Sequence, residues 1–179
     1  TCDVSINSLH LTDVDIGYFD SRMRLNPPLR QQRDRDALRA GLADGTIDAL
    51  VSDHNPVSAD EKTLPFAEAE PGATGLELLL SLALKWAQES GLGLADAVAT
   101  VTSRSANVLG SALGTFAASA GRLTAGGAAD ICVFDPAAHW VVEPSALVSQ
   151  GQHTPFGGYE LPGRVKATLV GGRVAYTAA

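Results

Sequence analysis

Apolar and polar positions along the chain predict short strands and helices that alternate. The pattern predicts three short strands, at residues 2–6, 22–26 and 47–51. A helix is expected between the second and third strands, with Asp34 as its N-cap, an end near Asp44 and Gly45 as its stop. The order strand, loop, strand, helix, strand is typical of parallel βα units.

Further helices are predicted beyond a long loop at residues 58–73. Residues 75–90 carry a wide apolar face at helical spacing, and residues 94–102 and 105–109 are predicted as two shorter helices. The Ala-, Gly- and Ser-rich segment 111–121 is predicted to be a mobile surface loop.

The last fifty residues follow a strand pattern. Residues 130–135 are expected to form a buried strand that ends at Pro136, because proline cannot donate to a ladder. Residues 165–170 and 173–176 flank Gly171-Gly172, which predicts a two-residue hairpin turn. We therefore expect a separate β layer in this part of the chain.

Length and charge limit the classes of protein to be considered. The chain has 179 residues, fewer than the roughly 250 of a complete (β/α)8 barrel. It opens on Thr1, so we expect the C-terminal part of a longer protein. The net charge is −7, and without a basic stripe or polybasic run we expect neither nucleic acid nor membrane as a partner.

The two cysteines bear on the compartment. Cys2 and Cys132 lie far apart in the sequence, and Cys132 falls in an apolar run. Two buried, reduced thiols are favoured over a disulfide, and this is typical of a cytoplasmic protein.

Residues 51–57, Val-Ser-Asp-His-Asn-Pro-Val, carry the clearest chemistry. An apolar strand runs directly into Asp53 and His54 and then into a turn closed by Pro56. In a (β/α)8 barrel, a carboxylate at the C-terminal tip of a strand faces the mouth, where it can bind metal or take a proton. Two alternatives stay open, because Asp53 could simply cap the following turn and His54 could simply pack.

Several motifs in order and register resemble those of the dihydroorotases, which are cyclic amidohydrolases. The resemblance includes the Asp53-His54 segment and covers nearly the whole chain. Its other motifs are Asn26-Pro27-Pro28-Leu29-Arg30, Asp34-Arg35, Asp44-Gly45-Thr46-Ile47-Asp48, Glu61-Lys62, Pro71-Gly72 with Gly75-Leu76-Glu77, Gly121-Arg122-Leu123, Ala129-Asp130, Phe134-Asp135-Pro136 and His153-Thr154-Pro155-Phe156.

The resemblance implies an α/β fold, the C-terminal half of an amidohydrolase (β/α)8 TIM barrel plus part of a small β-sandwich. Residues 1–120 would belong to the barrel and residues 121–179 to the sandwich. It also implies zinc-dependent interconversion of dihydroorotate and N-carbamoyl-aspartate, with Asp53 as metal ligand and general base. Asn26, Pro71 and Gly72 match substrate-binding positions. If residues 2–6, 22–26 and 47–51 are parallel strands, Asn7, Asn26 and Asp53 should meet at one rim.

Two family positions are altered. The resemblance places a zinc-ligand His where this chain has Asn7, and a substrate-binding His where it has Val57. A carboxamide oxygen is a poor replacement for imidazole at a zinc site, and an isopropyl group cannot bind a carboxylate. His10 could restore the metal site only if the chain bent, because on a continuing strand it would face away from Asn7.

Two functions follow. The first is a degenerate dihydroorotase-like subunit that binds no zinc, or binds it weakly, and assembles with the catalytic chains of aspartate transcarbamoylase and with the missing N-terminal half of its own protein. The second is an active zinc hydrolase. Asn7 and Val57 favour the first. For the subunit, we expect partner surfaces in the loop 58–73, around Leu64 and Phe66, and in the tail 151–163, at Phe156, Tyr159 and Leu161. For Phe66, packing onto the chain's own barrel is the favoured alternative.

Overall fold

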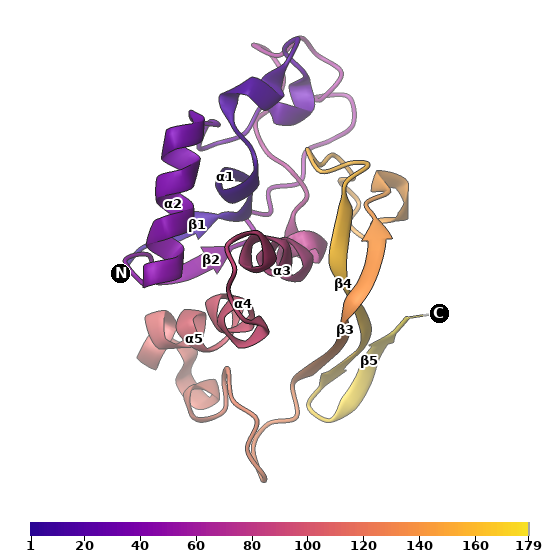
Figure 1. Ribbon diagram of the computed structural model, residues 1–179. Helices are drawn as coiled ribbons and strands as arrows, with labels where there is room; N and C mark the ends of the chain where they lie inside the picture. Colours follow the sequence, from indigo (N-terminus) through magenta and orange to yellow (C-terminus); the bar gives the residue numbers. More distant parts are fainter. Residues whose placement is uncertain (179) are drawn as a thin grey trace.

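The computed structural model describes residues 1–178 and has two β regions with helices between them (Figure 1). Strand β1 (Asp3–Ser5) pairs in parallel with β2 (Ala49–Val51), and Val4 is opposite Leu50. These strands correspond to the first and third predicted ones, shortened at their ends. Both lead into the apolar interior, since Val4 and Leu50 are buried.

The strand predicted at residues 22–26 does not form. A 3-10 turn, η2 (Ser21–Met23), begins there because the Asp20 carboxylate accepts the Arg22 N–H at 2.9 Å. The Arg24 carbonyl accepts hydrogen bonds from Gly72 N–H at 3.0 Å and from Lys62 Nζ at 3.0 Å. This backbone is thus satisfied by the loop 58–73, not by a ladder with β1 or β2.

Helix α1 (Ile6–His10) follows β1 directly. The chain then passes through a 3-10 turn, η1 (Asp13–Ile16), and through η2. Helix α2 (Gln32–Asp44) comes next and precedes β2. Asp34 is not the N-cap of α2. Gln31 takes that position, and the Asp34 carboxylate accepts its backbone N–H at 3.2 Å from the third helical position. Gly45 ends α2 as predicted, with a left-handed φ of 85°.

The predicted helix 75–90 consists of a 3-10 turn, η3 (Leu76–Leu78), and α3 (Leu79–Glu89). Helices α4 (Leu94–Val101) and α5 (Ser103–Leu109) follow as predicted. The segment predicted to be a mobile loop is 3-10 helix η4 (Gly110–Ala118), kinked at Gly114. In Figure 1, α3 lies between the β1–β2 pair and the C-terminal sheet.

The C-terminal sheet has the antiparallel order β3-β4-β5, formed by β3 (Ile131–Val141), β4 (Glu160–Val170) and β5 (Arg173–Thr177), with η5 (Pro144–Ala146) after β3. The predicted end at Pro136 is wrong, because β3 continues through it. The pairing shifts between Asp135 and His139, and such an irregularity accommodates a residue that has no N–H. Gly171 and Gly172 make the predicted hairpin turn, with φ of 55° and 77°.

One apolar core joins the β1–β2 region to the C-terminal sheet through α3. Its largest fully buried side chains come from segments far apart in the sequence, among them Trp86, Phe156, Ile6, Leu9, Leu42 and Leu161. Phe156 packs edge-on against Tyr159 at 5.4 Å between ring centres. The expectation that Phe156 and Leu161 form a partner surface is therefore wrong, because the chain's own core buries them.

Both cysteines are free, but their predicted burial is wrong. Cys2 and Cys132 are exposed. Cys132 and its neighbour Val133 in β3 are both exposed, so an apolar run in the sequence does not ensure that a strand is buried. Within residues 1–178, no helix combines the length and the apolar character needed to cross a bilayer.

Candidate functional site

The Asp53 carboxylate and the backbone of Asn7 both contact the Ser5 hydroxyl where β1 and β2 end. The Ser5 hydroxyl donates to Asp53 Oδ2 at 2.9 Å and accepts the Asn7 backbone N–H at 3.2 Å. Ser5 is at once the last residue of β1 and the N-cap of α1. Asp53 adopts φ of 49°, a left-handed conformation that Asp tolerates better than most residues.

The segment that follows Asp53 is held by residues 71–76. Asn55 N–H donates to the Ala73 carbonyl at 2.9 Å, and Asn55 Nδ2 donates to the Pro71 carbonyl at 3.2 Å. A Cβ on Gly72 would stand 2.5 Å from the Asn55 carbonyl oxygen, so only glycine fits there. Pro71 and Gly72 therefore lie beside the Asp53 segment.

Asn26 is joined to this region only through the backbone. Its side chain is exposed, and the nearest link is the hydrogen bond from Gly72 N–H to the Arg24 carbonyl. The loss of the predicted second strand explains this position, because Asn26 does not follow a strand end that points into the rim. The role of Asn26 in substrate binding stays a prediction.

Val57 is packed into the fold. It is 6% exposed, and a Cβ on Gly72 would lie 2.9 Å from its Cγ2. A Cβ on Gly151 would lie 3.3 Å from the Val57 nitrogen. The position that resembles a substrate-binding His thus holds a smaller apolar side chain enclosed by two glycine segments.

His10 turns away from Asn7 and Asp53. Its Nε2 lies 3.0 Å from the Leu82 carbonyl of α3, and its ring packs edge-on against Phe156. Burial lowers the pKa of His10 to about 4, and the Leu82 hydrogen bond only partly offsets this. The possibility that a bend would bring His10 to the metal site is therefore wrong, because α1 directs it to α3.

The other histidines have backbone partners. His54 Nδ1 accepts the N–H groups of Gly75 at 3.2 Å and Leu76 at 3.3 Å, which supports its predicted packing role. His139 is exposed, and its Nδ1 lies 3.1 Å from the Ala137 carbonyl oxygen. His153 is partly buried, and its carbonyl accepts the Thr74 N–H at 2.7 Å.

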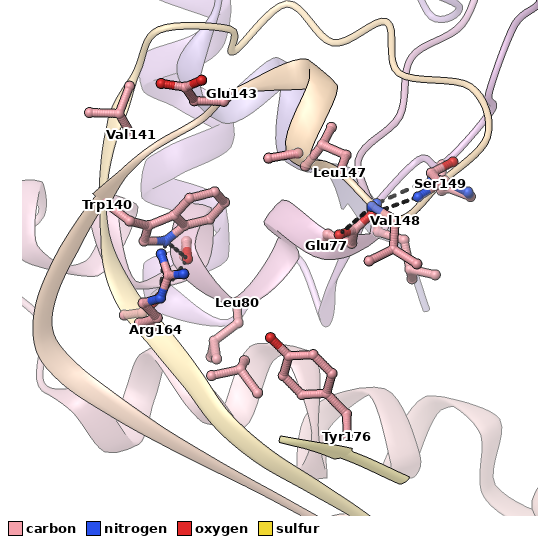
Figure 2. Close-up of a pocket in the computed structure, with 16 residues that line it drawn as sticks. Glu77, Leu80, Trp140, Val141, Glu143, Leu147, Val148, Ser149, Arg164 and Tyr176 are labelled. Carbon is pink, nitrogen blue, oxygen red and sulfur yellow. Dashed lines mark hydrogen bonds between the residues drawn. The ribbon is translucent and has the colours of Figure 1, made fainter. Parts of the chain in front are cut away.

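A cavity of about 730 Å³ lies beside this region, between the start of α3 and the C-terminal sheet (Figure 2). Glu77 accepts the N–H groups of Val148 at 3.1 Å and Ser149 at 3.0 Å, and Trp140 Nε1 donates to Ser81 Oγ at 3.2 Å. The sequence pattern does not predict this cavity. A signal was present in Glu77, an acidic residue at the start of an apolar helix.

The cavity and the Asp53 site have few residues in common. Of the residues around the strand ends, His54 lines the cavity, whereas Asp53, Asn7, Val57 and Gly72 are not among its walls. The predicted site is a tightly hydrogen-bonded strand junction next to this cavity.

The described residues of this chain do not by themselves make up a complete zinc site. A protein zinc centre takes three or four His, Cys or carboxylate ligands. Among residues 1–178, no group of three or more His, Cys, Asp or Glu side chains is placed to hold a metal. Asn7 stands at the ligand position, Asp53 is bonded to Ser5, and His10 is bonded to α3.

Comparison with known proteins gives the class. The family model for the amidohydrolase family matches residues 7–175, and the chain belongs to this family. The fold is that of the hydantoinases: a D-hydantoinase structure aligns over 98% of this chain and 39% of its own, with a TM-score of 0.84 and 26% identity. An L-hydantoinase from Arthrobacter aurescens aligns over the same shares, with a TM-score of 0.87 and 26% identity.

Within the family, the chain is similar to dihydroorotases. A dihydroorotase of Geobacter sp. (strain M21) is 40% identical over 178 residues, which is 99% of this chain and 40% of the relative. A dihydroorotase-like protein of Pseudomonas aeruginosa is 42% identical over 176 residues, which is 98% of this chain and 40% of the relative. The chain thus spans about two-fifths of the length of these curated relatives.

Proposed function

We propose that this chain is part of a cytoplasmic dihydroorotase-like protein of pyrimidine biosynthesis that no longer hydrolyses dihydroorotate and serves as a structural subunit for aspartate transcarbamoylase. The observation that carries the proposal is the strand junction at Ser5, Asn7 and Asp53. There, one zinc ligand of the family is a carboxamide and the retained carboxylate bonds to a hydroxyl.

The substrate side supports the same conclusion. A charge-assisted hydrogen bond contributes roughly 1.5–3 kcal/mol, and the family's His that would make it corresponds to Val57. Because Val57 is enclosed by Gly72 and Gly151, this position offers a substrate carboxylate neither a donor nor space.

A structural subunit needs surface that binds a partner, and the chain has an apolar ledge for it. We call Val14, Tyr18, Phe19 and Leu64 the Tyr18 ledge; their exposed fractions are 81%, 105%, 72% and 43%. Phe19 lies edge-on to Phe66 at 5.8 Å, so the ledge is continuous with the loop 58–73. Exposed aromatic side chains are typical of interface cores. We propose that catalytic chains of aspartate transcarbamoylase bind here.

The test uses the protein at its natural length. We expect no hydrolysis of dihydroorotate with zinc supplied, and loss of transcarbamoylase assembly or activity in cells that lack the protein. Turnover at ordinary enzyme rates, about 1–10³ s⁻¹, would overturn the proposal. Normal transcarbamoylase in the deletion strain would overturn the structural role.

The alternative is an active zinc-dependent cyclic amidohydrolase that interconverts dihydroorotate and N-carbamoyl-aspartate. Retention of Asp53, Asn26, Pro71 and Gly72, together with about 40% identity to proteins named dihydroorotase, favours it. Metal ligands from outside this chain would then have to supply what Asn7 does not. Stoichiometric zinc together with turnover in the assay above would distinguish this alternative.

A further inference from the structure

The hydrogen bond between the Ser5 hydroxyl and the Asp53 carboxylate joins the ends of two strands. We propose that it is a metal-independent tie that fixes the ends of β1 and β2, so that Asp53 is a positioning residue of the fold. This inference rests on the proposed loss of hydrolysis and names what the retained carboxylate does in its place.

The Ser5 hydroxyl acts as both donor and acceptor at this junction. A hydroxyl offers one hydrogen and two lone pairs. Ser5 spends its hydrogen on Asp53 Oδ2 at 2.9 Å and accepts the Asn7 N–H with a lone pair at 3.2 Å. One side chain therefore caps α1 and binds the carboxylate beyond β2. The bond to Asp53 is charge-assisted, which makes it stronger than a bond between neutral groups.

The backbone ladder between the strands it joins is short. The parallel ladder has three residue pairs and ends at Ser5 opposite Val51. The Ser5–Asp53 bond begins where the ladder stops and connects positions 48 residues apart in sequence. It therefore extends the pairing of β1 and β2 by side chains past the last backbone pair.

The backbone conformation of Asp53 also supports this inference. A φ of 49° costs free energy for any residue other than glycine, and it persists where the surroundings determine it. The surroundings of Asp53 within residues 1–178 supply Ser5 and no set of metal ligands. Within residues 1–178, the Ser5 hydroxyl binds the carboxylate of Asp53, and residues 71–76 hold the backbone that follows it.

The experiment is a double-mutant cycle in the natural-length protein with Ser5→Ala, Asp53→Ala and the double variant, followed by urea denaturation. Each single change should raise the equilibrium constant for unfolding by about tenfold to a hundredfold, as expected for the loss of a hydrogen bond to a charged group. In the double variant, the fold-change of this equilibrium constant should be far smaller than the product of the two single fold-changes. Ser5→Thr, which keeps the hydroxyl, should restore stability, and Ser58→Ala, at an exposed position, should change nothing.

A zinc titration completes the test. The tie predicts that added zinc leaves the melting temperature of the wild type and of Asp53→Asn unchanged. Independent effects of Ser5→Ala and Asp53→Ala, or stabilisation by zinc that disappears in Asp53→Asn, would overturn the inference. If Asp53→Ala does not fold, Asp53→Asn replaces it in the cycle. Hydrolysis by the wild type would overturn the proposed function but leave the coupling of Ser5 and Asp53 measurable.

Discussion

His10 should make the protein lose stability at mildly acidic pH. In the fold, burial against α3 lowers the pKa of its imidazole from 6.5 to about 4, while the Leu82 carbonyl and Glu89 act in the opposite direction. Arg39 and Lys85 also disfavour its charged form. Because the folded state prefers neutral His10, the unfolded chain takes up the proton first as the pH falls. The stabilising contribution is therefore present above pH 6.5 and is lost as the pH falls from 6.5 to about 4.

The size follows from the two pKa values. Each pKa unit corresponds to about 1.4 kcal/mol, so the full difference is about 3 kcal/mol. Between pH 7 and pH 5 the free energy of unfolding should fall by about 2 kcal/mol through His10 alone. The pKa values of Asp20 and Glu89 are also lowered, but from ordinary values of 3.8 and 4.5, so their effects fall below this window.

The assay is urea denaturation at several pH values from 7 to 5, for the wild type and for His10→Gln. Glutamine does not titrate, so the slope attributed to His10 should disappear in this variant even if its stability at pH 7 is lower. His139→Gln is the matched control, since His139 is exposed and this change should leave the slope intact. An unchanged slope in His10→Gln would refute the reasoning.

Three further predictions concern the site and the surface. The purified natural-length protein should hold far less than one zinc per chain after dialysis, and elemental analysis that finds about one would contradict this. Val57→His should destabilise the fold by about 1–3 kcal/mol through overpacking against Gly72 and should not restore hydrolysis; unchanged urea denaturation would argue against the enclosed position. Tyr18→Ala with Phe19→Ala should weaken binding to the catalytic chain of aspartate transcarbamoylase at least tenfold in calorimetry, whereas Val148→Ala, 84% exposed elsewhere, should not. Equal binding by all three proteins would remove the Tyr18 ledge from the interface.

The sequence alone determined the elements whose causes are local. Helix α2 ends at Gly45 because a left-handed residue is needed there, and the β4–β5 turn falls at Gly171-Gly172 because both residues take positive φ. The placement of Asp53 after a buried strand was equally readable, because an apolar run and a turn are close in sequence. These features depend on a few neighbouring residues, so a pattern of neighbours predicts them.

Only the tertiary structure decided where side chains point and which partners satisfy the backbone. Residues 22–26 have strand-like alternation, but Lys62 and Gly72 take the Arg24 carbonyl, so no ladder forms. The sequence leaves open whether His10 faces the metal site, but α1 directs His10 to the Leu82 carbonyl. Phe156 is buried against the rings of His10 and Tyr159. Each outcome depends on groups tens of residues away in the chain. Competition among such groups for the same hydrogen bonds and the same volume is resolved only when the chain is folded.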